Sequence, residues 1–389
     1  MVNSETWDRA CHLTCEMIAI DTINPMGGPY DCDRPVERPL VEFLEERFAD
    51  ADVVLRRDRV SDMHENLEIR IAGQTDGPPL FFESHMDTVP ADDWPLQALA
   101  PRVEDGFVFG RGACDDKGSL AAMTLAVLEL VETGQVPPRP VVLLAAGDEE
   151  CAQTGIRHYM QATDQRFSLG VFGEPTGNVP VIQHKGTIRW DITTHGKSAH
   201  TSQSELGRNA IHEMVQVIQT IQNYEERMQS VHTNPLLSGP RITPTMIQGG
   251  RTRNAVPDEC TIAVDYRILP GLKGVVEREK LIAELETLGV AITHAPPQTD
   301  APSLSTPPDD PQLQAFLEIS REVLGGQVVP VGAPYTSDAS WMSPAVTTVV
   351  LGPGNIRYAH AIDERIPVAE IVQAAEIYRR LMLYDWSAA

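Results

Sequence analysis

The sequence predicts an α/β protein, in which a doubly wound, mostly parallel sheet forms the larger domain and a ferredoxin-like α+β domain is inserted into it. The first observation is the run Val-Val-Leu-Leu-Ala-Ala at residues 141–146, whose uninterrupted apolar character is typical of a strand buried on both faces. The second is the Ala-, Leu- and Met-rich segment 120–132, which predicts a buried helix leading into that strand and hence a right-handed β-α-β unit. The third is a change of pattern in the middle of the chain.

Helical and strand patterns alternate in the outer parts of the chain. Apolar residues at helical spacing predict a helix before residue 50: Val36, Leu40, Phe43, Leu44 and Phe48. Before the apolar run, strands are expected at residues 53–55, 67–71 and 80–83, with a turn at 73–79. Later strands should end at Phe172 and at residues 349–351, and a last helix should cover residues 368–383.

The middle of the chain has the order strand, helix, strand, strand, helix, strand, which is that of a ferredoxin-like unit. The six expected elements cover residues 187–194, 209–226, 242–248, 261–268, 275–288 and 290–293. Stretches rich in Gly, Pro, Asp and Thr at 173–180 and 296–311 resemble linkers. We therefore assign residues 1–183 and 295–389 to the larger domain and residues 184–294 to the inserted domain.

The charge of the chain disfavours several classes of partner. The chain carries 55 acidic and 31 basic residues, for a formal net charge of −24. Nucleic acids and anionic membranes need a basic surface, so neither is an expected partner. Residues 1–13 lack a basic segment followed by an apolar one, and the longest apolar-rich segment, 120–131, is too short to span a bilayer. We expect a soluble, cytoplasmic protein.

Potential metal ligands follow the expected strands, where an open α/β sheet places its site. They are His85 and Asp87, Glu149 and Glu150, Glu174, His360, and Asp115 in a loop before a helix. Imidazoles and carboxylates converging on one sheet edge would suit zinc, cobalt or manganese. Each motif alone has a simpler interpretation as a solvated acidic turn or a loop histidine. The expected convergence of all these motifs on one edge of the sheet favours the metal site, because unrelated acidic turns would not be expected to lie at the same edge.

The motifs also resemble a known family, the dinuclear zinc amidohydrolases that include acetylornithine deacetylase, succinyl-diaminopimelate desuccinylase and the glutamate carboxypeptidases. The resemblance spans nearly the whole chain in matching order. It is carried by Ser84-His85-Met86-Asp87, Gly110-Arg111-Gly112-Ala113-Cys114-Asp115-Asp116-Lys117-Gly118, Asp148-Glu149-Glu150, Gly173-Glu174-Pro175-Thr176, Gly196-Lys197-Ser198-Ala199-His200, and Gly352-Pro353-Gly354 with His360.

The resemblance implies two zinc ions, with cobalt or manganese as alternatives. It implies that His85 and Glu174 hold one metal, that Glu150 and His360 hold the other, and that Asp115 bridges them. The two cations would lower the pKa of a bridging water, which then attacks an amide carbonyl.

The resemblance further implies catalytic roles for three residues. Glu149 would be the general base that takes the proton of the water and returns it to the leaving amine. Asp87 would orient the His85 imidazole. His200 would reach across a homodimer to stabilise the oxyanion in the partner's site, although alone it could be an exposed loop histidine. The family pattern also implies a cis peptide between Asp115 and Asp116.

The inserted domain would serve as a lid and as the dimer interface. Asn254, Arg267 and Gly354 are the expected substrate-binding residues, with Arg267 binding an amino-acid carboxylate.

Two departures from the family pattern bear on the identity of the substrate. Asp116 replaces the Met of many members and is commoner in the carboxypeptidase and dipeptidase branches. Ser340 and Trp341 replace an Arg-aromatic pair of the desuccinylase branch.

The sequence thus predicts a metal-dependent hydrolase that cleaves the amide bond of N-acylated amino acids, with acetylornithine-deacetylase-like activity first. Carboxypeptidase or dipeptidase activity on short peptides comes second, and succinyl-diaminopimelate desuccinylase activity is less favoured. A metal-retaining binding protein without catalysis is a further alternative, against which the presence of Glu149 argues.

Overall fold

The computed structural model describes residues 4–30, 33–92 and 94–388, and the chain divides into two compact units. Unit 1 comprises Met1–Ile182, Thr306–Val331 and Ser337–Ala389, and unit 2 comprises Gln183–Ser305 and Gly332–Thr336. The interval 184–294, which the sequence assigns to an inserted domain, falls within unit 2.

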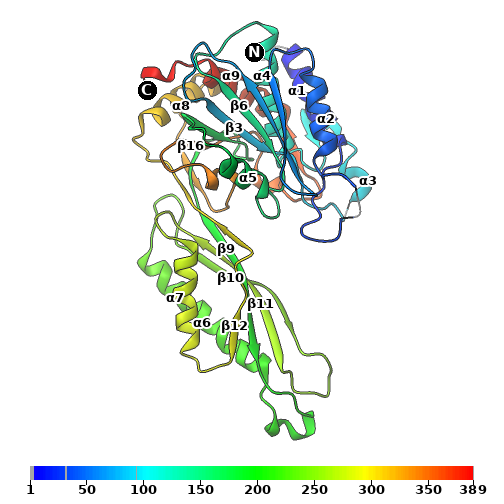
Figure 1. Ribbon diagram of the computed structural model, residues 1–389, viewed down its shortest axis with the longest axis vertical. Coiled ribbons are helices and arrows are strands. Elements are labelled where there is room, and N and C mark those ends of the chain that lie inside the picture. The colour runs from blue at the N-terminus through cyan, green and yellow to red at the C-terminus, as the bar shows by residue number, and fades with distance from the viewer. Residues whose placement is uncertain (1–3, 31–32, 93, 389) are drawn as a thin grey trace. The chain divides into compact units, whose positions relative to one another are not determined.

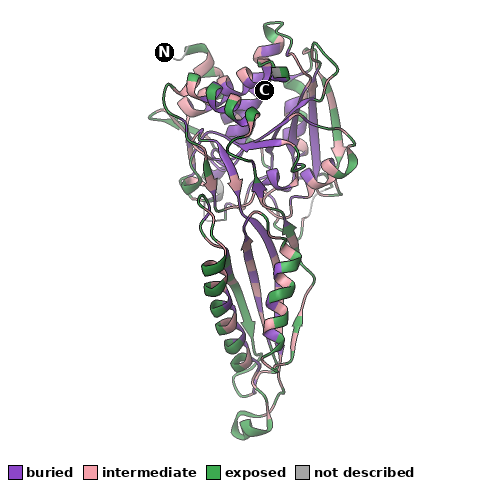
Figure 2. Ribbon diagram, turned by 90° about the vertical axis from the view of Figure 1, so that its left-hand side faces the viewer, coloured by how far each residue is buried: buried purple, intermediate pink, exposed green. Residues whose placement is uncertain are grey.

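Unit 1 is built on a central sheet in which the strands follow the order β1-β2-β6-β3-β7-β16 (Figure 1). These strands are β1 (Val54–Arg59), β2 (Glu65–Ile71), β6 (Val141–Ala146), β3 (Leu80–His85), β7 (Leu169–Phe172) and β16 (Thr347–Val350). β6, β3, β7 and β16 are parallel, whereas β2 is antiparallel to both of its neighbours, β6 and β1. Every residue of these four parallel strands is buried, as Figure 2 shows. The predicted fold class is confirmed.

Helices cover both faces of this sheet because neighbouring residues of a strand point to opposite sides. In β3, the ring of Phe81 lies 5.7 Å from that of Tyr159 in α5 (Thr154–Ala162). The next residue, Phe82, lies 5.9 Å from Tyr378 in α9 (Val368–Leu383). The buried helix α4 (Lys117–Glu132) connects β3 to β6 and packs against α9, as the sequence predicts.

Several elements of unit 1 are absent from the sequence-based prediction. They are α1 (Ser4–Ala19), α3 (Pro95–Ala98), α5, α8 (Pro311–Leu324) and a small sheet of β17 (Arg365–Pro367), β5 (Phe107–Phe109) and β4 (Arg102–Glu104). The predicted helix before residue 50 is α2 (Arg38–Arg47). Short helical turns complete the unit at η2 (Asp338–Trp341), η3 (Ile356–Tyr358) and η4 (Trp386–Ala388).

Unit 2 has the predicted ferredoxin-like order, with its main strands arranged β10-β11-β9-β12. Its elements are β9 (Gly186–His195), η1 (Thr201–Leu206), α6 (Ala210–Val231), β10 (Arg241–Gly249), β11 (Glu259–Ile268), α7 (Gly274–Glu286) and β12 (Ile292–His294). The short strand β13 (Thr299–Ala301) also pairs with β9. Three further short strands stand where the chain passes between units: β8 (Val181–His184), β14 (Leu304–Ser305) and β15 (Val331–Ala333). β10 pairs with β11 on one side only, so it forms an edge of the described sheet.

Across the described ranges, no helix combines the length and the apolar character that crossing a lipid bilayer would require.

Candidate metal centre

The predicted ligands of unit 1 stand at the carboxyl edge of its parallel strands. His85 is the last residue of β3, Glu149 and Glu150 follow β6 within four residues, and Glu174 follows β7. Parallel strands end at the same edge of a sheet, so their following residues come together there although they are far apart in the sequence.

Asp115 lies between the two histidines, with a different carboxylate oxygen toward each. Its Oδ1 is 3.1 Å from Nε2 of His85, and its Oδ2 is 3.3 Å from Nε2 of His360. The same His360 nitrogen lies 3.2 Å from Oε2 of Glu150. The peptide bond between Asp115 and Asp116 is cis, as predicted.

A hydrogen bond to the backbone of Asp87 orients the imidazole ring of His85. Nδ1 of His85 lies 2.9 Å from the backbone oxygen of Asp87. A carbonyl oxygen can only accept, so Nδ1 carries a proton, and Nε2, which faces the carboxylate cluster, is the nitrogen that could bind a metal. The Asp87 carboxylate is farther from this nitrogen, at 3.5 Å.

The Asp87 carboxylate instead holds the turn that carries the adjacent glutamates. Its Oδ1 accepts from the backbone N–H of Glu149 at 3.0 Å, and its Oδ2 accepts from that of Glu150 at 3.3 Å. The Asn24 side chain donates to Asp87 at 2.8 Å and to Asp148 at 3.0 Å. Asp148 has a φ of 62°, so this polar network stabilises a backbone conformation that a non-glycine residue rarely adopts.

The buried carboxylates fit a cation. Burial is the main cause that raises the pKa of Glu150 to about 8 and that of Glu174 well above its usual value, and the Asp115 charge adds to both shifts. Oε1 of Glu150 is buried without a hydrogen-bond partner. Several carboxylates that are buried together can be ionised at the same time only if a positive charge, such as a bound cation, compensates them.

Among the residues that the structure describes, two sets of side chains bring their ligand atoms within 4.8 Å of one another. One is His85, Glu149 and Glu174, and the other is His85, Asp115 and Glu150. Nitrogen and oxygen donors in this mixture suit zinc, cobalt or manganese.

Comparison with known proteins agrees with this geometry. The sequence profile of peptidase family M20/M25/M40 matches residues 81–384. The chain belongs to this family. An acetylornithine deacetylase of Proteus mirabilis is 31% identical over 329 residues, which cover 82% of this chain and 81% of that protein. A probable succinyl-diaminopimelate desuccinylase of Staphylococcus epidermidis is 27% identical over 405 residues, covering 94% of this chain and 95% of that one.

Solved structures show the same fold. An M20 family metallo-carboxypeptidase of Sulfolobus solfataricus superposes with a TM-score of 0.79 at 19% identity, over 97% of this chain and 99% of its own. The resemblance drawn from the motifs is therefore confirmed, and the protein is an M20 family hydrolase.

A buried ion pair, missed by the sequence analysis, fixes the Asp115 loop of this M20 protein. Oε1 of Glu364 accepts from the backbone N–H groups of Cys114 at 2.9 Å and Asp115 at 3.1 Å. Its Oε2 accepts from Nη1 of Arg111 at 2.6 Å, and neither side chain of the pair is more than 3% exposed. The one available signal was the position of Glu364, four residues after His360.

Gly354 is in unit 1, close behind the Asp115 loop. It has a φ of 88°, and a Cβ at this position would stand 2.8 Å from Sγ of Cys114. Its backbone N–H donates to Oε2 of Glu370 at 2.8 Å. The positive φ and the short distance to Cys114 favour glycine at this position, independent of any contact with substrate.

The remaining predicted residues lie in unit 2. His200 is exposed, and its Nδ1 accepts from the backbone N–H of Ser202 at 3.2 Å. Asn254 is also exposed. The guanidinium of Arg267 pairs with both oxygens of Asp265, at 3.0 and 3.1 Å, and its Nη1 donates to Oγ1 of Thr336 at 3.1 Å.

Proposed function

We propose that this M20 protein is a metal-dependent hydrolase that cleaves the amide bond of N-acylated amino acids, with an acetylornithine-deacetylase-like activity. The observation that carries the proposal is the position of Asp115, which directs one oxygen toward His85 and the other toward His360. A carboxylate with its two oxygens on two different ligand groups is suited to bridging two cations. The acetylornithine deacetylase among the relatives supports the choice of substrate.

In this proposal His85 and Glu174 hold one cation, Glu150 and His360 hold the other, and Asp115 bridges them. Two zinc ions, or cobalt or manganese, would supply an activated water and polarise the substrate carbonyl. The orphaned Oε1 of Glu150 supports its assignment as a ligand.

Glu149 is the proposed general base. Its backbone N–H is held by Asp87, and its carboxylate lies in the set with His85 and Glu174. Glu149 would accept the proton of the attacking water and then transfer it to the leaving amine, while Asp87 keeps the turn in place. Burial raises the pKa of Glu149. A carboxyl group whose pKa is shifted toward neutral pH is better suited to both accepting and returning a proton.

Unit 2 is proposed to act as a lid and dimerisation domain that supplies His200, Asn254 and Arg267. The edge strand β10 supports this, because Met246 and Ile247 on it are 73% and 63% exposed. Pairing of two such edges about a two-fold axis would cover them. Binding of a substrate carboxylate to Arg267 would have to compete with Asp265.

A carboxypeptidase or dipeptidase activity is the second candidate, and Asp116 favours it. Asp116 is fully buried beside the bridging Asp115 and accepts from Oγ of Ser84 at 2.5 Å. Desuccinylase activity is a third candidate in view of the Staphylococcus relative. A cytoplasmic location, and the lack of nucleic-acid and membrane partners, stay predictions from composition.

A substrate panel tests the proposal. The purified protein is loaded separately with zinc, cobalt and manganese and assayed against N-acetyl amino acids, N-succinyl amino acids and dipeptides, with a chelator-treated sample as the control. We expect the highest kcat/KM on a basic N-acetyl amino acid and loss of turnover on chelation. Preference for dipeptides would replace the first candidate with the second, and no turnover in any metal form would favour the non-catalytic alternative.

A further inference from the structure

Gln153 joins the proposed base to a tryptophan on another element of unit 1. Its side-chain Nε2 donates to Oε1 of Glu149 at 3.0 Å, and its Oε1 accepts from the indole Nε1 of Trp341 at 3.1 Å. Gln153 immediately precedes α5, whereas Trp341 is the last residue of η2, 188 positions farther along the chain.

The two partners determine which way the Gln153 amide points. An indole N–H can only donate, so the amide oxygen must face Trp341. An ionised carboxylate can only accept, so the amide nitrogen must face Glu149. The reversed amide would place donor against donor and acceptor against acceptor, and it would lose both hydrogen bonds. Trp341 therefore fixes the orientation in which Gln153 can donate to Glu149.

The backbone of Gln153 is equally constrained. It adopts the left-handed conformation, with a φ of 54°, and its N–H donates to the backbone oxygen of Asp148 at 2.6 Å. The residue is 6% exposed, so solvent cannot readily replace its two side-chain partners. A left-handed glutamine at this point is costly, and the turn is retained by its hydrogen bonds.

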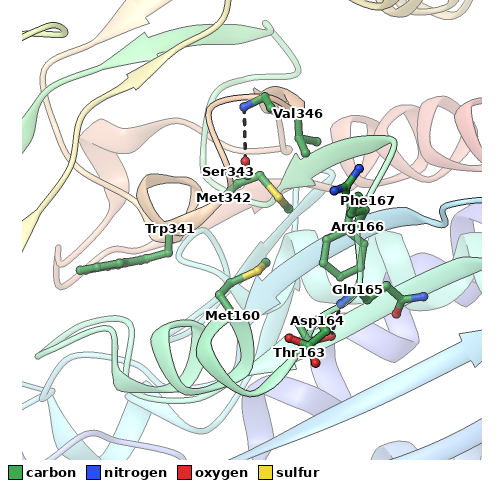
Figure 3. A pocket seen from close by; sticks show the side chains of 11 residues that line it. Met160, Thr163, Asp164, Gln165, Arg166, Phe167, Trp341, Met342, Ser343 and Val346 are labelled. Carbon is green, nitrogen blue, oxygen red and sulfur yellow. Dashed lines mark hydrogen bonds between the residues drawn. The ribbon is translucent and has the colours of Figure 1, made fainter.

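The indole ring of Trp341 is also held by a contact other than its hydrogen bond to Gln153. The guanidinium of Arg157, in α5, lies 5.0 Å from the centre of the indole ring. The indole borders a cavity of about 720 Å³, in which it lies across from Phe167 and Arg166 (Figure 3). The ring is thus fixed by α5 on one side while its N–H reaches Gln153.

We propose that Gln153, oriented by Trp341, is a positioning residue for the carboxylate of Glu149. Holding Oε1 of Glu149 leaves its Oε2 as the oxygen that exchanges the proton in the reaction. Trp341 acts one step farther away, through Gln153 alone. This inference rests on the proposed role of Glu149 as general base.

The test uses Gln153→Met, which keeps the length of the side chain without its amide, and Trp341→Phe, which removes the indole N–H and keeps an aromatic ring. Loss of a hydrogen bond to a charged group predicts a kcat reduced by about 10- to 100-fold in Gln153→Met. Loss of the hydrogen bond between the neutral groups of Trp341 and Gln153 predicts a kcat reduced by about 3- to 10-fold in Trp341→Phe. KM and metal content should remain those of the wild type, and the unfolding midpoint should fall modestly, because each variant leaves a polar group of the pair without its partner.

The double variant Gln153→Met/Trp341→Phe separates a relay from two independent effects. If Trp341 acts only through Gln153, the double variant should have the kcat of Gln153→Met. Multiplied effects would show that Trp341 acts by another route. Trp386→Phe is the matched control, because its indole N–H also donates one hydrogen bond, to the backbone oxygen of Leu381 at 2.9 Å, away from this turn.

A measurement without substrate or metal completes the test. The chain has five tryptophans, so protein labelled with 15N at the indoles gives up to five N–H signals. The signal missing in Trp341→Phe should move in Gln153→Met, whereas the signal missing in Trp386→Phe should not. An unmoved Trp341 signal, or wild-type kcat in Gln153→Met while Glu149→Ala is inactive, would overturn the inference. Activity retained in Glu149→Ala would instead refute the proposed base.

Discussion

Replacing Glu364 tests how the loop of the bridging ligand is held. Glu364→Ala would leave the guanidinium of Arg111 buried, with its Nη2 still donating to the backbone oxygen of Pro90 at 3.2 Å and its centre 5.4 Å from the Trp94 ring, but without a carboxylate to balance its charge. It would also remove the acceptor of the backbone N–H groups of Cys114 and Asp115. Breaking a buried ion pair by removing one partner costs about 3–5 kcal/mol, which is a large part of the stability of a typical domain.

The assay is urea unfolding of the metal-free protein, together with a chelator competition for metal affinity. The urea midpoint of Glu364→Ala should fall by about 1–2 M. Metal affinity should fall by about 10- to 100-fold, as is usual when a group that supports a ligand is lost. Glu364→Gln, which keeps an acceptor oxygen but loses the charge, should fall between Glu364→Ala and the wild type in both measurements.

Two further variants control for the loss of charge. Glu318→Ala breaks an exposed ion pair, in which the side chain of Glu318 is 70% exposed and that of Arg321 is 37% exposed. This variant should change the free energy of unfolding by less than about 1 kcal/mol. The double variant Arg111→Leu/Glu364→Leu should recover much of the lost stability, because an apolar pair leaves no buried charge. It should not recover metal affinity, since the loop N–H groups still lack an acceptor. Wild-type midpoint and wild-type metal affinity in Glu364→Ala would refute the reasoning.

Three other predictions concern separate parts of the molecule. Asn24→Ala should lower kcat by about tenfold with metal content unchanged, because the carboxylate of Asp87 that holds the catalytic turn loses a buried donor; unchanged steady-state kinetics would argue against this role. Burial lowers the pKa of His184 to about 4, so the unfolded chain binds a proton that the folded chain does not, and stability should fall as the pH drops from about 6.5 to 4; urea midpoints across this range should depend less on pH in His184→Asn. If His200 acts across a dimer, mixed dimers of His200→Ala and Glu149→Ala chains should recover roughly a quarter of wild-type activity, and no recovery in verified mixed dimers would place His200 in its own site or in none.

The strand ends were predictable because buried parallel strands have a strong sequence signal and the following turns carry charged residues. The run 141–146 is β6, and the acids after it lie at the sheet edge as expected. Helix α8 is absent from the prediction, and its N-cap and first residue lie in the stretch 296–311, which was interpreted as a linker. Asp310 is in fact the N-cap, accepting from the backbone N–H of Leu313 at 2.9 Å, and Pro311 is the first helical residue.

Long-range polar pairs had no such signal. Arg111 and Glu364 are 253 positions apart, and Gln153 and Trp341 are 188 apart. No spacing or periodicity relates such residues, and they meet only because the sheet and its helices bring their loops together. The supporting contacts of the site therefore required the structure, whereas the candidate ligands did not.

Elemental analysis of two neighbouring variants tests the central claim most directly. If Glu150 is a ligand and Glu149 is the base, Glu149→Ala should retain two metals per chain and lose turnover, whereas Glu150→Ala should lose a metal. Two metals retained in Glu150→Ala and one lost in Glu149→Ala would contradict the assignment.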